Sequence, residues 1–255
     1  PNSVTSIGSG AFSGCSGLTS VTIPGSVTSI GDWAFEGCTG LESVTVVNGV
    51  TVIGSYAFYN CMNLETIDTP DSVLYIGEGA FADTAWYDNQ PYGLIYIGKV
   101  AYKYKGECPE SVIIKDGTLG IAGAAFTGQD ELTSITIPNS VISIGEEAFD
   151  NCWSLSDAYY GGSESDKEKI DFGDYKYILL SATWHYAIND STPGDLDGVE
   201  GITDSDAVYL LMHTFFPEQY PVDQTCDFDG DGGVTDADAV YLLMYTFFPE
   251  QYPID

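Results

Sequence analysis

The stretch Leu18-Thr-Ser-Val-Thr-Ile-Pro-Gly-Ser-Val-Thr-Ser-Ile-Gly-Asp-Trp-Ala-Phe-Glu-Gly-Cys38 decides the fold, because the chain repeats it. The motif Ile-Gly-x-x-Ala-Phe inside it recurs at intervals of 23, 23, 23, 21, 24 and 23 residues, with variant fifth and sixth copies, beginning at Ile7, Ile30, Ile53, Ile76, Ile97, Ile121 and Ile144. A unit of this length is too small to bury its apolar side alone. We therefore expect the units to stack into a solenoid over residues 1 to about 155.

A strand pattern repeats with the same period. Runs of the form Leu-x-x-[Val/Ile]-x-[Val/Ile] open at Leu18, Leu41, Leu64, Leu132 and Leu155. Side chains alternate along a strand, so the apolar positions should face inward. The outward positions are small and rich in hydroxyl groups: Ser20, Thr22, Ser43, Thr45, Thr66, Asp68, Ser134 and Thr136. Such a strip suits a broad protein partner, although threonine also simply favours an exposed strand.

The seven related units resemble the BspA-type leucine-rich repeat. The resemblance implies a β-rich leucine-rich-repeat solenoid with short helical and turn segments, and a role in adhesion or recognition. Residues 86–110 depart from the regular unit but keep Ile97-Gly98 and Ala101-Tyr102, which indicates a distorted repeat with a bulging loop. Its aromatic residues either bind sugar or pack the bulge: Trp86, Tyr87, Tyr92 and Tyr96.

The last coil has an open apolar end that needs a cap. We expect residues 159–163 and a strand over 177–186 to supply it. The polar, proline-containing residues 189–194 then form a linker. The predicted organisation is multidomain, with a repeat domain and its cap over 1–188, the linker, and a second domain over 195–255.

The cysteines predict buried thiols more than disulfides. Four of them take the same slot after Ala-Phe-x-x, namely Cys15, Cys38, Cys61 and Cys152. Stacked coils place equivalent side chains about 4.8 Å apart and parallel, which suits a ladder of small residues better than a disulfide. Cys108 and Cys226 have no Cys-x-x-Cys or histidine partner nearby, so we do not expect zinc.

An acidic loop near the C-terminus has the spacing of a calcium site. It reads Asp227-Phe-Asp229-Gly-Asp231-Gly-Gly233-Val-Thr235-Asp-Ala-Asp238, with oxygen donors at positions one, three, five, nine and twelve and the Gly233 carbonyl at seven. Calcium prefers six to eight oxygen ligands. We therefore predict that this loop binds calcium and that ion binding orders the helix that follows.

An earlier loop, Asp195-Leu-Asp197-Gly-Val-Glu-Gly201-Ile-Thr203-Asp-Ser-Asp206, has Val199 at the fifth position. Water, a main-chain oxygen or Glu200 could substitute there, so we expect two calcium ions with the first bound more weakly. Its predicted ligands are Asp195, Asp197, Gly201, Thr203 and Asp206.

Each loop leads into a near-identical helix, over residues 203–217 and 235–249. The duplicated loop and helix, with Asp at position twelve and no preceding helix, resemble a dockerin, a small all-α module with paired EF-hand-like loops. The resemblance implies a cohesin domain of a scaffoldin as partner, and a secreted, extracellular protein attached to a cell-surface cellulosome.

The helices carry two apolar faces, and so small a module cannot bury both. One face should therefore bind the cohesin, or else pack on the repeats. Its residues are Ser205, Val208, Tyr209, Met212 and Phe215, with the equivalents Ala237, Val240, Tyr241, Met244 and Phe247. Because the copies nearly match, a partner could bind either helix after a half-turn.

The amino-acid composition argues against several classes of function. The net charge is −31, with no arginine, and no lysine follows Lys176, which argues against binding to nucleic acid or to an anionic membrane. No run of eighteen apolar residues exists that would cross a bilayer. The chain begins inside a repeat without a signal peptide, so we expect it to be a fragment.

The sequence shows no evident catalytic site. Glycoside hydrolysis needs two carboxylates across a cleft, whereas the acids of the repeats are scattered: Glu42, Glu65, Asp68, Asp83 and Glu146. Neither His185 nor His213 lies near a nucleophile turn. We expect a non-catalytic protein whose repeats bind a protein partner. The alternatives are a polysaccharide-degrading enzyme with its catalytic domain N-terminal to this fragment, and repeats that serve only as a spacer.

Overall fold

The computed structural model describes residues 3–186, 207, 210–211, 213 and 234–247. Backbone contacts divide the chain into two units. The first comprises Pro1–Ala158 with Lys169–Thr183, and the second Tyr159–Glu168 with Trp184–Asp255. No helix among the described residues is long and apolar enough to span a bilayer.

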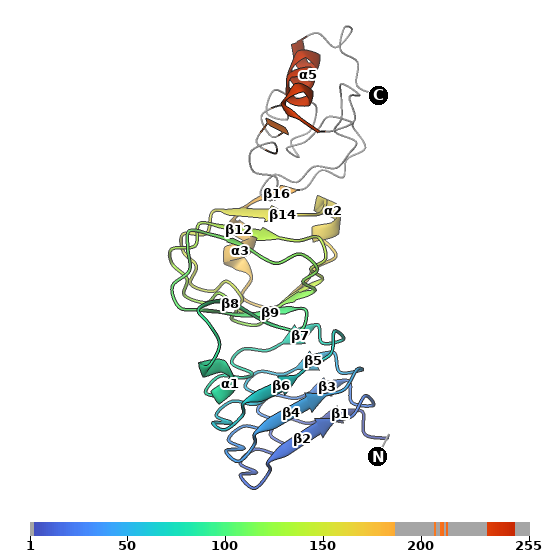
Figure 1. The fold of residues 1–255 in the computed structure, drawn as a ribbon, viewed down its shortest axis with the longest axis vertical. Coiled ribbons are helices and arrows are strands. Elements are labelled where there is room, and N and C mark those ends of the chain that lie inside the picture. The colour runs from blue at the N-terminus through green and yellow to red at the C-terminus, as the bar shows by residue number, and fades with distance from the viewer. Residues whose placement is uncertain (1–2, 187–206, 208–209, 212, 214–233, 248–255) are drawn as a thin grey trace. The chain divides into compact units, whose positions relative to one another are not determined.

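The first unit is a solenoid in which each regular coil contributes two short strands (Figure 1). One parallel sheet has the order β1 (Ser6–Ile7), β3 (Ser29–Ile30), β5 (Val52–Ile53), β7 (Tyr75–Ile76). The other has the order β2 (Ser20–Ile23), β4 (Ser43–Val46), β6 (Thr66–Asp68). Each strand pairs in register with the residue one period later, as Ser6 with Ser29 and Ser20 with Ser43, which confirms the predicted repeat.

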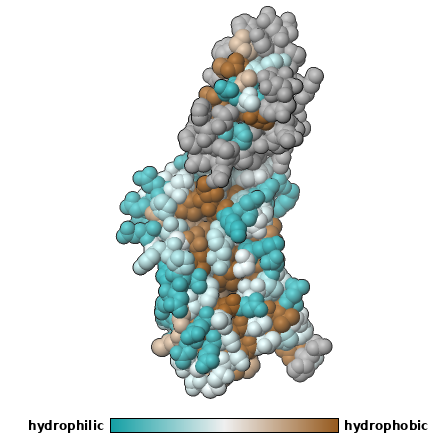
Figure 2. Space-filling model, in the orientation of Figure 1, coloured by the Kyte–Doolittle hydropathy of each residue, from teal (hydrophilic) through white to brown (hydrophobic). Residues whose placement is uncertain are grey.

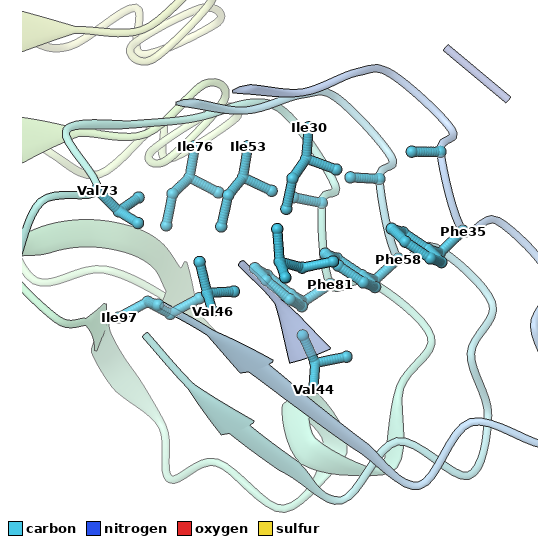
Figure 3. Packing of buried hydrophobic residues seen from close by; sticks show 14 of the residues in the cluster. Ile30, Phe35, Val44, Val46, Ile53, Phe58, Val73, Ile76, Phe81 and Ile97 are labelled. Atoms are coloured by element: carbon cyan, nitrogen blue, oxygen red, sulfur yellow. The ribbon is translucent and has the colours of Figure 1, made fainter. Parts of the chain in front are cut away.

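The core consists of ladders of equivalent residues from successive coils (Figure 3). Phe12, Phe35, Phe58 and Phe81 stack with ring centroids 5.0, 5.0 and 5.2 Å apart. Ile30, Ile53 and Ile76 are fully buried beside them, as the Ile-Gly-x-x-Ala-Phe motif requires. Burial of these apolar side chains is the main force that holds the coils together.

The prediction of buried thiols is confirmed for Cys38, Cys61 and Cys152 and is wrong for Cys15, which lies in the first described coil. Cys38, Cys61, Cys108 and Cys152 are buried, Cys15 is exposed, and all five are free thiols. The sulfur of Cys61 donates to the Phe35 carbonyl at 3.1 Å, and Cys38 and Cys152 make the equivalent bonds. Burial raises the pKa of the Cys61 thiol to about 12, so it stays protonated and serves as a donor. Cys226 lies outside the described residues.

The distorted repeat predicted over residues 86–110 is present and contains an antiparallel hairpin. α1 (Ala85–Asp88) precedes β8 (Gly93–Ile97), which pairs antiparallel with β9 (Val100–Lys105) across a register shift at Ile95/Tyr96. Tyr102 takes the place of the core phenylalanine, and its hydroxyl accepts from the Phe81 amide at 2.9 Å. The irregular coil thus fills the same core with a different side chain.

The remaining coils resume the parallel pattern. One sheet has the order β10 (Ser111–Ile113), β12 (Ser134–Ile137), β14 (Asp157–Tyr160), β16 (Thr183–Tyr186). Another joins β15 (Asp171–Phe172), β13 (Ser143–Ile144), β11 (Gly120–Ile121), β9 and β8.

The expected strand over 177–186 is only half correct. Tyr177–Ser181 form the short helix α3, and the strand β16 begins at Thr183. Of α3 only Leu179 is buried, while Tyr177 and Leu180 are exposed. One helical turn directs a single side chain inward, which the alternating pattern of a strand could not do here. A second short helix, α2 (Glu164–Lys167), begins with a capping box at Ser163.

In the second unit the structure describes the helix α5 (Asp236–Phe247). It confirms a helix directly after the second acidic loop. Equivalent positions of the two duplicated segments are buried, namely Ala207 and Leu210 with Ala239 and Leu242. The predicted all-α fold of 195–255 otherwise lies outside the described residues.

Candidate functional site

The predicted outward strip is formed on the sheet β2-β4-β6. Parallel pairing aligns Ser20 with Ser43 and Thr66, and Thr22 with Thr45 and Asp68. We call these six residues the strand strip. The coils therefore convert a 23-residue period in sequence into two adjacent rows of small polar side chains.

Burial alternates along the strands as expected. On β4 the inward Val44 and Val46 are 1% and 4% exposed, whereas Ser43 and Thr45 are partly exposed. On β2 the outward Ser20 and Thr22 are exposed. The visible face of the lower coils is pale and teal, with apolar side chains between (Figure 2). The residues of the strip are therefore partly or fully exposed to solvent.

The other two predicted strip residues lie in a different sheet. Ser134 and Thr136 on β12 pair with Ser111 and Ile113 on β10. Ile113 is 49% exposed in a row that otherwise carries hydroxyl groups. The sequence pattern missed Ile113 because its unit lacks the opening leucine of the regular run. The distorted repeat therefore divides the hydroxyl-bearing positions between two sheets.

The aromatic residues of the distorted repeat mostly pack. Trp86 lies 5.9 Å from Phe81 and 6.2 Å from Tyr102 between ring centroids. Tyr87 packs edge-on against Tyr102, and the Tyr96 hydroxyl accepts from the Lys115 amide at 2.8 Å. Only Tyr92 is largely exposed, at 84%. These contacts favour the packing role over the sugar-binding one for Trp86, Tyr87 and Tyr96.

Lys105 explains why the bulge is ordered. Its ammonium donates to the carbonyls of Tyr87, Asp88 and Gln90 at 3.0, 2.8 and 2.8 Å. It also lies 5.2 Å from the ring centre of Tyr87. The lysine thus satisfies the orphan carbonyls where α1 ends.

The acids considered for catalysis are all exposed, as expected for solvated surface positions: Glu42, Glu65, Asp68, Asp83 and Glu146. His185 stacks on Tyr159 with ring centroids 4.5 Å apart. Within the part of the chain that the structure describes, no three acidic, histidine or cysteine side chains form a metal-binding group.

Two of the predicted calcium ligands are described, Thr235 and Asp238. Asp238 is fully buried and accepts from the Thr235 amide at 2.7 Å and from its hydroxyl at 3.4 Å. Burying a carboxylate is costly unless hydrogen bonds or a cation compensate it. These oxygen donors fit the hard ligand set that calcium prefers.

The predicted cohesin-binding residues of α5 are partly open. Val240 is 59% exposed and Ala237 is also exposed, while Tyr241 and Met244 are partly buried. The opposite stripe, with Ala239 and Leu242, is buried. The structure therefore distinguishes the two apolar faces of this helix.

Several predicted site residues lie outside the described residues. They are the ligands Asp195, Asp197, Gly201, Thr203, Asp206, Asp227, Asp229, Asp231 and Gly233 and the partner residues Ser205, Val208, Tyr209, Met212 and Phe215. The side chain of Phe247, another predicted partner residue, is likewise not described. Their roles stay predictions.

Comparison with known families agrees with the repeat architecture. The BspA type Leucine rich repeat region matches in six copies over residues 1–103 and 95–175. No dockerin family matches the C-terminal part. A search of curated proteins finds no match.

Solved structures of other repeat proteins are similar to this chain. A T. pallidum leucine rich repeat protein is 22% identical, with 62% of this chain and 70% of that one covered and a TM-score of 0.32. A leucine rich cell surface protein from Faecalibacterium prausnitzii is 22% identical, with coverages of 66% and 86% and a TM-score of 0.25. A leucine-rich repeat protein from Bacteroides ovatus is 23% identical, with coverages of 73% and 67% and a TM-score of 0.30.

Proposed function

Because the chain belongs to the BspA-type leucine-rich repeat family, we propose that it is a secreted, non-catalytic binding protein with two tasks. Its repeats bind a protein partner through the strand strip. Its C-terminal segment docks the protein on the cohesin domain of a scaffoldin in a calcium-dependent manner, as part of a cell-surface cellulosome.

The alignment of the strand strip carries the first task. Three strands in register place six small polar side chains in two rows, on a scaffold whose inward residues pack in or against the core. A partner that lies across these strands meets a preorganised surface, so little conformational entropy is lost on binding. Small side chains also let a broad partner surface approach closely.

Calcium would be held in the second loop by Asp227, Asp229, Asp231, the Gly233 carbonyl, Thr235 and Asp238. When bound, calcium neutralises the loop carboxylates and ties the loop to the helix. The buried Asp238 at the start of α5 supports this proposal, since its carboxylate already faces the hydroxyl of Thr235. The first loop would bind a second ion more weakly.

The exposed stripe of α5 supports the docking surface. Burial of Ala239 and Leu242 uses one apolar face, which leaves Val240 and Ala237 available to a cohesin. The equivalent Ala207 and Leu210 are buried in the first copy too. If a cohesin is to bind either helix after a half-turn of the module, the two helices must bury and expose equivalent positions. The matching burial in the two copies agrees with this requirement.

The strip is tested by surface-plasmon binding of the whole chain to a panel of purified extracellular proteins. A protein that binds should lose affinity at least tenfold, about 1.4 kcal/mol, when Thr45→Lys places a long cation in the centre of the strip. The matched control is Ser16→Lys, at an exposed turn position outside the strip. Equal affinities for both variants would mean that the repeats act as a spacer or bind elsewhere.

A further inference from the structure

The turns of the solenoid contain two positions per coil with a left-handed backbone. The first position holds Gly10, Trp33, Tyr56, Gly79, Ala124 and Glu147. The second holds Gly14, Gly37, Asn60, Asp83, Gly128 and Asn151. Every residue at the second position is Gly, Asn or Asp, the types that tolerate this backbone best. The first position breaks that rule.

Trp33 and Tyr56 are the largest departures from it. Their φ angles are 53° and 57°, a region that is unfavourable for bulky side chains. The coils on either side of this pair use glycine at the same place, Gly10 and Gly79. The backbone therefore does not require an aromatic residue here, and residues held in such strained conformations cluster at functional sites.

The two rings form a short stack along the coils. Their centroids lie 5.9 Å apart with planes inclined by 7°. Tyr56 also lies against Gly79, where a Cβ atom would come within 2.5 Å of its ring. At Gly10 a Cβ atom would meet nothing within 4 Å, and Trp33 is 45% exposed. The face of Trp33 turned away from Tyr56 is therefore open.

Several carboxylates lie near this stack. Burial, and then a hydrogen bond to the Glu78 carboxylate, raise the pKa of the Tyr56 hydroxyl to about 12. Tyr59 packs edge-on against Tyr56 at 5.7 Å, and a hydrogen bond to the Asp83 carboxylate raises its pKa. Glu36, one turn after Trp33, accepts from the Ser13 hydroxyl at 3.3 Å.

The wider charge around the stack is uniformly negative in sequence. Residues 1–98 contain no Lys, Arg or His, but they contain nine acids: Asp32, Glu36, Glu42, Glu65, Asp68, Asp71, Glu78, Asp83 and Asp88. An anionic ligand would be repelled by this half of the solenoid. A cation would be attracted by the carboxylates and by the negative face of an aromatic ring.

We propose that the open face of Trp33, backed by Tyr56 and with Glu36 beside it, is a binding site for a lysine or arginine side chain of a protein partner. The open face of Trp33 receives the cation, and Glu36, whose carboxylate reaches Ser13 of the preceding coil, neutralises it. A neutral sugar ring could also stack on Trp33, but it would gain nothing from the surplus of negative charge. Charge complementarity therefore favours a basic protein segment.

This site is separate from the strand strip, because it lies on the turns between strands. It shares with the proposed function only the premise that the repeats bind protein. Variants at the turns and at the strands therefore report on the two surfaces independently. A failure of the turn site would leave binding at the strip intact.

The test is fluorescence titration of the whole chain with a labelled ten-residue oligolysine peptide, at low and at physiological salt. A chain of charge −31 attracts such a peptide at many places, so dependence on Trp33 is the decisive readout. Trp33→Gly should weaken binding about two- to five-fold, the range for an exposed cation–π contact. Its melting temperature should stay the same or rise, since glycine suits the left-handed backbone.

Three further measurements keep the result unambiguous. Trp33→Tyr preserves a ring and should retain most of the affinity, which separates loss of the ring from loss of folding. Trp153→Ala removes a tryptophan that is 72% exposed elsewhere and should change nothing. Glu36→Gln should weaken binding and reduce its salt dependence.

Equal peptide affinity for Trp33→Gly and the unaltered chain would overturn the proposal. So would a clear fall in melting temperature for Trp33→Gly, which would make Trp33 a packing residue. Binding of a neutral cello-oligosaccharide that depends on Trp33, without such dependence for the peptide, would assign the stack to sugars instead.

Discussion

The regular coils and the C-terminal helix are both duplicated sequences, yet duplication has opposite consequences in them. In the coils every copy buries the apolar residues of its neighbour, so Phe35 and Phe58 are 1% and 0% exposed. In α5 one stripe is buried and Val240 on the other remains 59% exposed. Stacked repeats complete their own core, whereas the repeated helix leaves part of an apolar face exposed.

The two regions also differ in what they bury. The coil core is a ladder of Ile, Val, Leu and Phe, whereas α5 begins with the fully buried Asp238. Apolar burial needs no ligand, but a buried carboxylate is stable only with donors or a cation beside it. With the proposed calcium loops, we therefore expect the coils to be stable alone and the C-terminal segment to depend on calcium.

The largest expected effect is that of calcium removal. Excess chelator should unfold residues 195–255 and leave the coils folded, because the proposed calcium ligands all lie in the former. Hydrogen exchange of the whole chain, followed by peptide, measures both regions at once. If the amides of the last sixty residues stayed fully protected from exchange in chelator, the C-terminal segment would not depend on calcium, and the proposed difference from the coils would be wrong.

The reverse perturbation is a cavity in the coils. Phe58→Ala removes the centre of the phenylalanine ladder and should destabilise the coils by about 3–5 kcal/mol. Calcium affinity should not change, because the loops rely on different residues. Denaturant unfolding and calcium titration measure the two effects.

The control for this cavity is Met62→Ala, at a side chain that is 59% exposed. It should change stability by less than about 0.5 kcal/mol. A loss of calcium binding in Phe58→Ala would show that the two regions fold together.

Within the C-terminal segment, the two predicted calcium loops can be compared with each other. Asp229→Ala should weaken calcium binding by about tenfold or more, because it removes a charged ligand of the complete loop. Val199→Ala should have little effect, since valine supplies no ligand oxygen. Calorimetric titration with calcium measures both, and equal losses would mean that the first loop is not the weaker site.

The smallest effect concerns the acidic turns of the solenoid. Burial first, and then Glu78, Asp150 and Glu146, raise the pKa of Glu147. The folded protein therefore binds this proton more tightly than the unfolded chain does. Stability is lost as pH rises from the ordinary value of 4.5 through the raised one.

Glu147→Gln should consequently stabilise the coils at pH 7 by no more than about 0.5 kcal/mol, since solvent screens this carboxylate. The gain should vanish at pH values below 4.5, where both states bind the proton. Thermal unfolding at several pH values measures the gain, with the exposed Glu131→Gln as control. A gain that grows toward low pH would contradict the assigned sign.

The periodic parts of the molecule could be predicted from sequence because repetition averages out local ambiguity. The position of Ile30, Phe35 and Cys38 in the core follows from their recurrence every 23 residues. The helix α5 follows from its apolar pattern and its acidic start. In each case many residues follow the same periodicity, so the pattern is visible in the sequence.

Features that occur once could not be predicted in the same way. One such feature is the antiparallel pairing of β8 with β9, and another is the helix α3. Both depend on contacts that do not recur in the other coils. The stack of Trp33 and Tyr56 occupies a variable position of the motif, so its backbone strain was invisible in the sequence. Its only signal was that two aromatic residues stand one period apart.

The most direct test is calorimetric titration of the chain with a panel of cohesins, in calcium and again in excess chelator. The account predicts tight binding to at least one cohesin in calcium and none in chelator. That binding should weaken when Val208, Met212, Val240 and Met244 are replaced together. Absence of binding to every cohesin in calcium would contradict the docking function and leave the repeats as the remaining binding module.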